Sequence, residues 1–211
     1  ARVRVVANAV DTDVFRPPDS RPPSSEARGP ARLLTVAALT EKKGHSDLLM
    51  ALAGLRAQRE VTLDLVGDGE LRSALQARAH ELGLADFVRF HGERPQAEVA
   101  ELMRQTDLFV LPSRFENLPV VLIEAMASGL KAVATAVGGV PELRDTAGDG
   151  LWLCPPNQPD ELANTIARAL DARAQMDPAA LAARATDRFG YTAIERIWTE
   201  IYAQLRGVKS Q

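Results

Sequence analysis

Residues 107–135 read DLFVLPSRFENLPVVLIEAMASGLKAVAT, and this stretch decides the fold. Short, mainly apolar runs at 107–111 and 131–135 are typical of buried strands, and the apolar segment at 118–128 has the length of a helix. A strand, a helix and a second strand in this order predict a βαβ unit, in which the two strands lie parallel in one sheet.

The same alternation of short apolar runs and longer helical patterns continues on both sides of this unit. It predicts an α/β fold, a doubly wound, Rossmann-like parallel sheet with helices on both faces. Ligands of such sheets bind beyond the carboxyl ends of the strands, so the loops there form the candidate site. The remaining strands are expected at 3–7, 32–39, 61–66, 86–90 and 151–154, and the remaining helices at 45–58, 69–82, 95–105, 140–145, 158–172, 178–187 and 190–206.

The composition excludes several classes of protein. With 25 Lys and Arg against 28 Asp and Glu, the formal net charge of −3 argues against a dedicated nucleic-acid binder. The single cysteine, Cys154, cannot form an internal disulfide, which fits a reducing compartment, and the three histidines lack ligand spacing, so no metal site is expected. No apolar run approaches the roughly 18 residues that a membrane-spanning helix needs.

The chain divides into a main domain at 1–190 and a last helix at 190–211. The Pro- and Ser-rich stretch at 17–31 is expected to be a surface loop or linker, because its composition disfavours regular structure. The strand expected at 3–7 starts almost without a preceding residue, which suggests that the chain is the second half of a longer protein.

The loop after the strand at 107–111 opens the apolar helix. Asn117 is expected as its N-cap, and Pro119 in the first turn lacks an N–H that the helix would not use. The free amides and the positive dipole end of a helix are a natural site for phosphate. We therefore expect the amides around Leu118 to bind an anion.

Two glutamates accompany this helix. Glu124 is the only ionisable residue between Asn117 and Leu130 on an otherwise apolar helix, and a buried carboxylate needs a partner or a ligand. Glu116 precedes the helix, so the two carboxylates would lie on either side of a bound phosphate, one near a sugar and one near a ribose. Alternatively, Glu116 is a solvated loop residue and Glu124 a salt-bridged core residue.

Two further loops could supply the rest of an anion site. Lys43 and Gly44 follow the strand at 32–39, where a lysine can act as a point charge against phosphate. Gly138 and Gly139 follow the strand at 131–135, and their amides could close around an anion or a sugar while Glu142 bonds hydroxyls. On this evidence alone an exposed loop explains the lysine turn better, and a plain turn explains the glycine pair equally well.

Other loops at the same edge are less informative. Gly67 and Gly69 form a Gly-x-Gly turn, but Arg72 replaces the third glycine of the dinucleotide fingerprint, so a nicotinamide site is rejected. The loop from His91 through Gly92 to Arg94 is a candidate contact for a nucleobase. A lone histidine is usually structural, and His91 receives no catalytic role.

In order and spacing, these segments resemble the C-terminal domain of the family-4 glycosyltransferases, a retaining group with the GT-B fold. The resemblance covers most of the chain and includes the two glutamates with seven residues between them. The matching motifs are Asn8-Ala9-Val10-Asp11, Lys43-Gly44, Val66-Gly67-Asp68-Gly69, Phe90-His91-Gly92, Leu111-Pro112-Ser113, Glu116, Glu124-Ala125-Met126-Ala127-Ser128-Gly129, Gly138-Gly139 and Glu142.

The resemblance implies one half of a GT-B enzyme that transfers a sugar from a UDP-, GDP- or ADP-sugar with retention of configuration and without a metal or other cofactor. Glu116 would touch the sugar, Lys43 and the amides at Asn117 and Leu118 the diphosphate, and Glu124 the ribose. The last helix would cross to an N-terminal acceptor domain absent from this chain, so the fragment alone would be inactive.

Two departures from the family pattern stand out. Ala37 and Ala38 replace the usual Gly-Arg before the lysine loop, which removes one phosphate cation unless Lys42 compensates. Lys131 replaces the usual proline after Gly129-Leu130. A lysine at the start of this strand is either tolerated there or marks a damaged or specialised site.

Two other functions remain open from the residues alone. The chain could be a non-catalytic module that binds a nucleotide or a sugar phosphate, or a sugar-nucleotide epimerase on the same architecture. The resemblance suggests bacterial polysaccharide biosynthesis in the cytoplasm, with association at the inner face of the membrane through the missing half as an alternative. No nucleic-acid partner is expected.

Overall fold

A computed structural model describes residues 4–18, 29–172 and 177–207. Its centre is a six-stranded sheet in the order β3-β2-β1-β4-β5-β6, and every neighbouring pair of strands is parallel. The predicted doubly wound fold is confirmed. The strands are β1 (Ala31–Val36), β2 (Val61–Val66), β3 (Val88–Gly92), β4 (Leu108–Leu111), β5 (Ala132–Thr135) and β6 (Leu151–Cys154).

The strand order creates a switch point between β1 and β4. From β1 the chain winds outward through β2 to β3, and from β4 it winds the other way through β5 to β6. The helices that follow β1 and β4 therefore pack on opposite faces of the sheet. In sheets of this kind the ligand-binding crevice lies outside the carboxyl ends of the two strands at this point.

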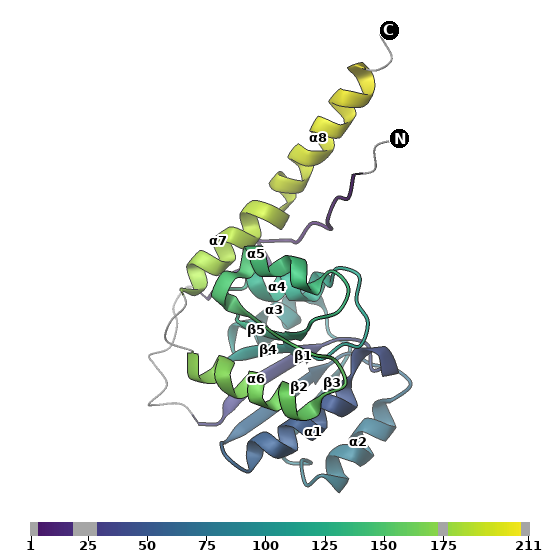
Figure 1. The fold of residues 1–211 in the computed structure, drawn as a ribbon, viewed down its shortest axis with the longest axis vertical. Helices are drawn as coiled ribbons and strands as arrows, with labels where there is room; N and C mark the ends of the chain where they lie inside the picture. The colour runs from purple at the N-terminus through teal and green to yellow at the C-terminus, as the bar shows by residue number, and fades with distance from the viewer. Residues whose placement is uncertain (1–3, 19–28, 173–176, 208–211) are drawn as a thin grey trace.

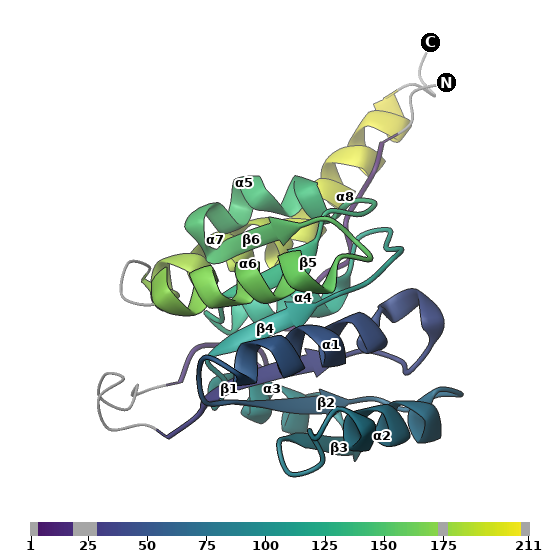
Figure 2. The ribbon, with the colours of Figure 1, turned by 60° about the horizontal axis from the view of Figure 1, so that its bottom comes forward.

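Helices cover both faces of the sheet (Figures 1 and 2). Two hydrophobic clusters, one on each face, join the helices to the strands. One face carries α1 (His45–Arg56), α2 (Arg72–Glu81) and α6 (Pro159–Asp171), and the other carries α3 (Gln96–Arg104), α4 (Val120–Ala127), α5 (Arg144–Ala147) and α7 (Pro178–Phe189). Within the described residues, three short 3-10 helices lie at Glu41–Lys43, Val140–Leu143 and Gly148–Gly150.

The helix α4 is buried because its sequence is apolar on nearly every side. Leu122, Ile123, Ala125 and Met126 have no accessible surface, and the helix packs between the sheet and α7. The helix begins at Val120 rather than at 118, with Pro119 as its N-cap residue. The prediction of Asn117 as N-cap is therefore wrong, since Pro119 already has the extended backbone of a cap and no helical turn precedes it.

The strand expected at 3–7 is also absent from its described part, residues 4–7. This segment pairs with no strand, and Val5 is 93% exposed. The first backbone pairing comes at Val10, whose amide donates to the carbonyl of Phe189. Apolar residues alone do not make a strand when no sheet edge is there to bond it. Most of the linker expected at 17–31 falls at 19–28, outside the described residues.

The last helix, α8 (Tyr191–Gly207), extends away from the body of the domain in both views (Figures 1 and 2). Ile194 near its start is buried, whereas Trp198 and Tyr202 are 45% and 59% exposed. The helix thus carries exposed aromatic residues along its free length. None of the described helices is both long and apolar enough to span a membrane.

Lys131 has a structural role at the amino end of β5. Its ammonium donates a 2.8 Å hydrogen bond to the carbonyl of Ala172, which ends α6, and lies 5.8 Å from the ring centre of Trp152. The side chain is almost fully buried. Lys131 lies at the opposite end of the sheet from the candidate site, so its departure from the family pattern does not alter that site.

Replacing Lys131 by alanine should lower the free energy of unfolding by about 2 kcal/mol, because the helix end loses its donor and Trp152 loses a packing partner. Urea unfolding followed by circular dichroism measures this change. Lys42→Ala is the matched control, since Lys42 is exposed and its loss should change stability by less than about 0.5 kcal/mol. Equal effects of the two substitutions would contradict the assignment.

Candidate functional site

The crevice at the switch point holds an ion pair between two loops. Lys43 follows β1, Glu116 follows β4, and the lysine Nζ lies 2.6 Å from the glutamate Oε1. Both side chains are largely buried, with 19% and 9% of their surface exposed. The hydroxyl of Ser113 donates to the same Oε1 at 2.7 Å, whereas Oε2 has no partner among the described residues. One carboxylate oxygen of Glu116 is thus fixed and the other is free.

Glycines allow these loops to approach one another closely. Gly44 has a φ of 67°, and a Cβ there would collide with the carbonyl of Pro112. Gly138 has a φ of 52°, and a Cβ there would collide with the carbonyl of Glu116. The loops after β1 and β5 therefore both pack against the loop that carries Glu116, and Thr135 at the end of β5 also bonds the carbonyl of Ser113.

The glycine pair differs from expectation in one respect. The amide of Gly139 donates a 2.6 Å hydrogen bond to the carbonyl of Asn117, so that amide is already used within the protein. The expectation that both glycine amides close around an anion is wrong for Gly139. Glu142, in the 3-10 helix that follows, is exposed at the edge of the same loop.

The N-terminus of α4 supplies free amides to the crevice. The first-turn N–H groups of a helix have no carbonyl partner within the helix, and here they belong to Val120 and Val121. No side chain caps this end of α4. The helix begins four residues after Glu116, so its positive dipole end lies close in the chain to the Lys43–Glu116 pair.

Glu124 is a half-buried carboxylate of the candidate site that has no partner among the described residues. No hydrogen bond or ion pair joins its carboxylate to any described residue, and burial raises its pKa. With Val120 and Val121 it forms the least buried strip of α4, about 6 Å along the axis from the helix start. The interpretation as a salt-bridged core residue fails for the described part of the chain. A half-buried carboxylate without a partner is suited to accept hydrogen bonds from a ligand.

His45 stabilises the lysine loop, which runs from the end of β1 to the start of α1 and carries Lys43. It is the first residue of α1, only 2% exposed, and its Nε2 lies 3.1 Å from the carbonyl of Ala38. Burial and, more weakly, the charge of Lys43 lower its pKa, while the bond to Ala38 opposes them. A neutral imidazole that donates from Nε2 therefore ties both ends of the loop together. This role was not predicted, because His45 stands alone in the sequence and belongs to no motif.

The loop proposed for a nucleobase is partly engaged elsewhere. His91 lies within β3, and its Nε2 is 2.6 Å from the Oδ1 of the buried Asp64 on β2. Arg94 is exposed and pairs with Glu98 at 3.3 Å. Gly92 and the chain after it remain at the carboxyl edge of the sheet, where a base would be expected.

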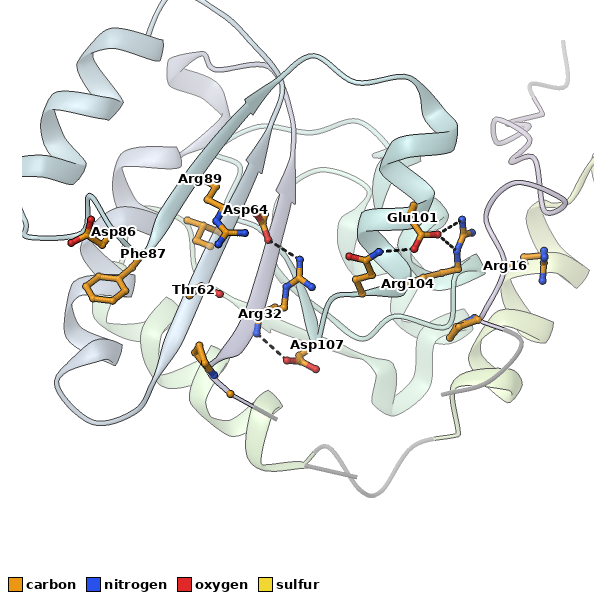
Figure 3. A pocket seen from close by; sticks show the side chains of 15 residues that line it. Arg16, Arg32, Thr62, Asp64, Asp86, Phe87, Arg89, Glu101, Arg104 and Asp107 are labelled. Atoms are coloured by element: carbon orange, nitrogen blue, oxygen red, sulfur yellow. Dashed lines mark hydrogen bonds and ion pairs between the residues drawn. The ribbon is translucent and has the colours of Figure 1, made fainter. Parts of the chain in front are cut away.

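A cavity of about 1010 Å³ lies away from this site (Figure 3). Its lining includes Arg32, Thr62 and Asp107, which stand at the starts of β1 and β2 and just before β4. The cavity is therefore at the amino end of the sheet, opposite the crevice. Among the described residues no group of three or more His, Cys, Asp or Glu side chains could hold a metal ion.

Comparison with known proteins assigns the family. A family model described as glycosyl transferases group 1 matches residues 18–188. The chain belongs to this glycosyltransferase family. A group 1 relative, the amylovoran biosynthesis glycosyltransferase AmsK of Erwinia amylovora, is 37% identical over 165 residues, which are 74% of this chain and 40% of that protein.

A further relative and a solved structure agree with this assignment. The MMP alpha-(1->4)-mannosyltransferase of Mycolicibacterium hassiacum is 33% identical over 81% of this chain and 40% of its own length. The structure of HepE from Anabaena in complex with UDP has a TM-score of 0.80 and 26% identity, over 95% of this chain and 57% of that one. The chain therefore has the fold of one half of a GT-B glycosyltransferase and spans about two fifths of these two relatives.

Replacing Glu124 by glutamine should stabilise the unliganded chain at pH 7.5. Because burial raises the folded pKa, the folded state binds more protons than the unfolded state between the two pKa values. The free energy of unfolding therefore falls as the pH rises through that window, and glutamine removes the loss. Urea unfolding at pH 7.5 and near pH 4.5 should show a gain that shrinks at the lower pH.

The exposed Glu142→Gln variant is the control for this experiment, and its stability should follow that of the parent chain at both pH values. A Glu124→Gln variant that is less stable than the parent at pH 7.5 would show that the carboxylate has a partner after all.

Proposed function

We propose that this chain is the donor-binding half of a retaining glycosyltransferase of family 4, which transfers a sugar from a nucleoside diphosphate sugar. The observation that carries the proposal is the Lys43–Glu116 pair at the switch point, beside the N-terminus of α4. It places a cation, free amides and a free carboxylate oxygen together. A sugar diphosphate needs this combination, since its phosphates take donors and its hydroxyls take acceptors.

The diphosphate would bind Lys43, the first-turn amides of α4 at Val120 and Val121, and the amides of Asn117 and Leu118 just before the helix. During transfer the bond between the anomeric carbon and the diphosphate breaks as a bond to the acceptor oxygen forms, and the proton of the acceptor hydroxyl passes to the departing diphosphate. Negative charge then develops on the departing diphosphate, where a lysine and a helix N-terminus stabilise it. These groups make a metal unnecessary for the proposed reaction.

Glu116 would bind the donor sugar through its free Oε2. Lys43 and Ser113 hold the other oxygen, so the carboxylate is oriented before the donor enters. When the diphosphate approaches, Lys43 can turn to it, while the Ser113 hydroxyl still holds Oε1. Retention of configuration follows the resemblance to family 4 and means that the acceptor attacks from the side that the diphosphate leaves.

Glu124 would accept hydrogen bonds from the two ribose hydroxyls. Its carboxylate lacks a protein partner and lies about 6 Å along α4 from the helix end that binds phosphate. The nucleobase would then lie toward Gly92 and Arg94, with Gly138 and Glu142 at the sugar end. HepE was solved with UDP and with UDP-glucose, which supports a uracil nucleotide as the first donor to test.

The acceptor would bind a separate N-terminal domain. The exposed aromatic stripe of α8, with Trp198 and Tyr202, is suited to cover such a domain. Relatives named for amylovoran and colanic acid biosynthesis support a role in bacterial polysaccharide assembly, where nucleotide sugars of the cytoplasm are used. Membership in the glycosyltransferase family favours this reading over a non-catalytic binding module or an epimerase.

Calorimetric titration with UDP, GDP and ADP and their sugar conjugates tests the donor site. We expect one diphosphate to bind with a dissociation constant between micromolar and millimolar, and Glu124→Ala to weaken it about tenfold through loss of the ribose bonds. Glu195→Ala, on the exposed side of α8, is the control and should bind as the parent does. Equal binding by Glu124→Ala would refute the ribose assignment.

The 211-residue chain by itself should bind the donor but transfer no sugar, because the acceptor domain is needed to complete the site. The same affinity is expected in magnesium and in EDTA, since protein groups neutralise the diphosphate. An assay of released nucleoside diphosphate with a panel of acceptors measures transfer. Turnover by this chain would overturn the half-enzyme proposal, and loss of binding in EDTA would overturn the metal-free one.

A further inference from the structure

Lys43 and Glu116 belong to different loops, which follow β1 and β4. We asked which other contact holds these two loops at a fixed distance when the ion pair opens. A donor that enters the crevice competes for both side chains and so weakens their mutual contact. The loops would then be free to drift unless another contact holds them. Arg114, which lies between Ser113 and Glu116, makes such a contact.

Arg114 binds three separate points of the lysine loop and the helix that follows it. Its amide donates to the carbonyl of Lys42 at 2.8 Å. Its guanidinium contacts both carboxylate oxygens of Asp47, in the first turn of α1, at 3.2 to 3.3 Å, and also pairs with Glu41. One residue of the β4 loop thus spans the whole turn that presents Lys43.

The charges around Arg114 argue against a direct role in binding phosphate. Its single positive charge faces the two carboxylates of Asp47 and Glu41, so it is already neutralised. The Asp47 side chain is only 13% exposed, and a bidentate guanidinium–carboxylate contact is directional as well as strong. Arg114 therefore does not take the place of the phosphate-binding arginine that the family pattern has at position 38.

We propose that Arg114 is a positioning residue, which clamps the lysine loop to the glutamate loop and so fixes the distance between the diphosphate and sugar subsites. This inference rests on the proposed function. With the clamp in place, Lys43 can release Glu116 to the donor while both loops keep their places. Without the clamp, each bound donor would have to order the two loops, and its affinity would fall.

A double-mutant cycle with Arg114→Ala and Lys43→Ala tests the clamp on the full chain. The probe is the diphosphate that the parent chain binds among UDP, GDP and ADP. Arg114→Ala should weaken binding about tenfold in the parent and hardly at all in the Lys43→Ala background, because it acts through Lys43. Additive losses would mean that Arg114 contacts the diphosphate itself and would overturn the proposal.

Asp47→Asn provides a second, independent variant. It breaks the same guanidinium contact without touching the β4 loop, and the clamp predicts weaker binding. If Arg114 were instead a phosphate ligand, freeing it from Asp47 would leave binding unchanged or strengthen it. Either of these two results overturns the clamp.

Arg59→Ala is the matched control, since Arg59 makes a similar two-point contact with Asp171 far from the crevice. It should leave binding unchanged, with all titrations made well below the unfolding temperature of each variant. If the parent chain binds no diphosphate, the proposed function fails. If the parent binds and Arg114→Ala binds equally, the function stands and the clamp alone is refuted.

Discussion

The contact between Lys43 and Glu116 is the constraint on which the site depends. Two charges this deeply buried cannot stand alone, because the desolvation of either would cost several kcal/mol without the other. In the unliganded chain they neutralise each other at 2.6 Å. A donor that brings both anionic phosphate and neutral hydroxyls can replace the pair with two new contacts, whereas a simple anion satisfies only the lysine and leaves the glutamate unpaired.

The sheet topology and two glycines make this contact possible. Lys43 and Glu116 are 73 residues apart, and they meet because β1 and β4 are neighbours at the point where the strand order reverses. Gly44 and Gly138 remove the side chains that would keep the loops apart. The fold therefore brings the loops to one edge, and the absence of a Cβ at two positions lets them touch.

Sequence patterns predicted the helices and strands better than the contacts between side chains. Six of the seven expected strands form, because apolar runs bounded by turns suit a buried parallel sheet, but 4–7 lacks an edge to pair with. The helix cap was misplaced because Asn117 and Pro119 both suit a helix start, and only the backbone decides between them. The contacts of Arg114 with Asp47 and of His91 with Asp64 join positions that are distant in the sequence, so no local sequence pattern predicts them.

In the proposed site, Glu124 sets function against stability. A glutamine or a hydrophobic residue would suit its place on α4 better in the absence of a ligand, since burial raises the carboxyl pKa and no described group compensates. The helix is otherwise optimised for packing, with four neighbouring side chains wholly inaccessible. A single unfavourable charge on so regular an element is best explained by a partner that comes from outside the chain, and a pair of vicinal hydroxyls fits a carboxylate's two acceptor oxygens.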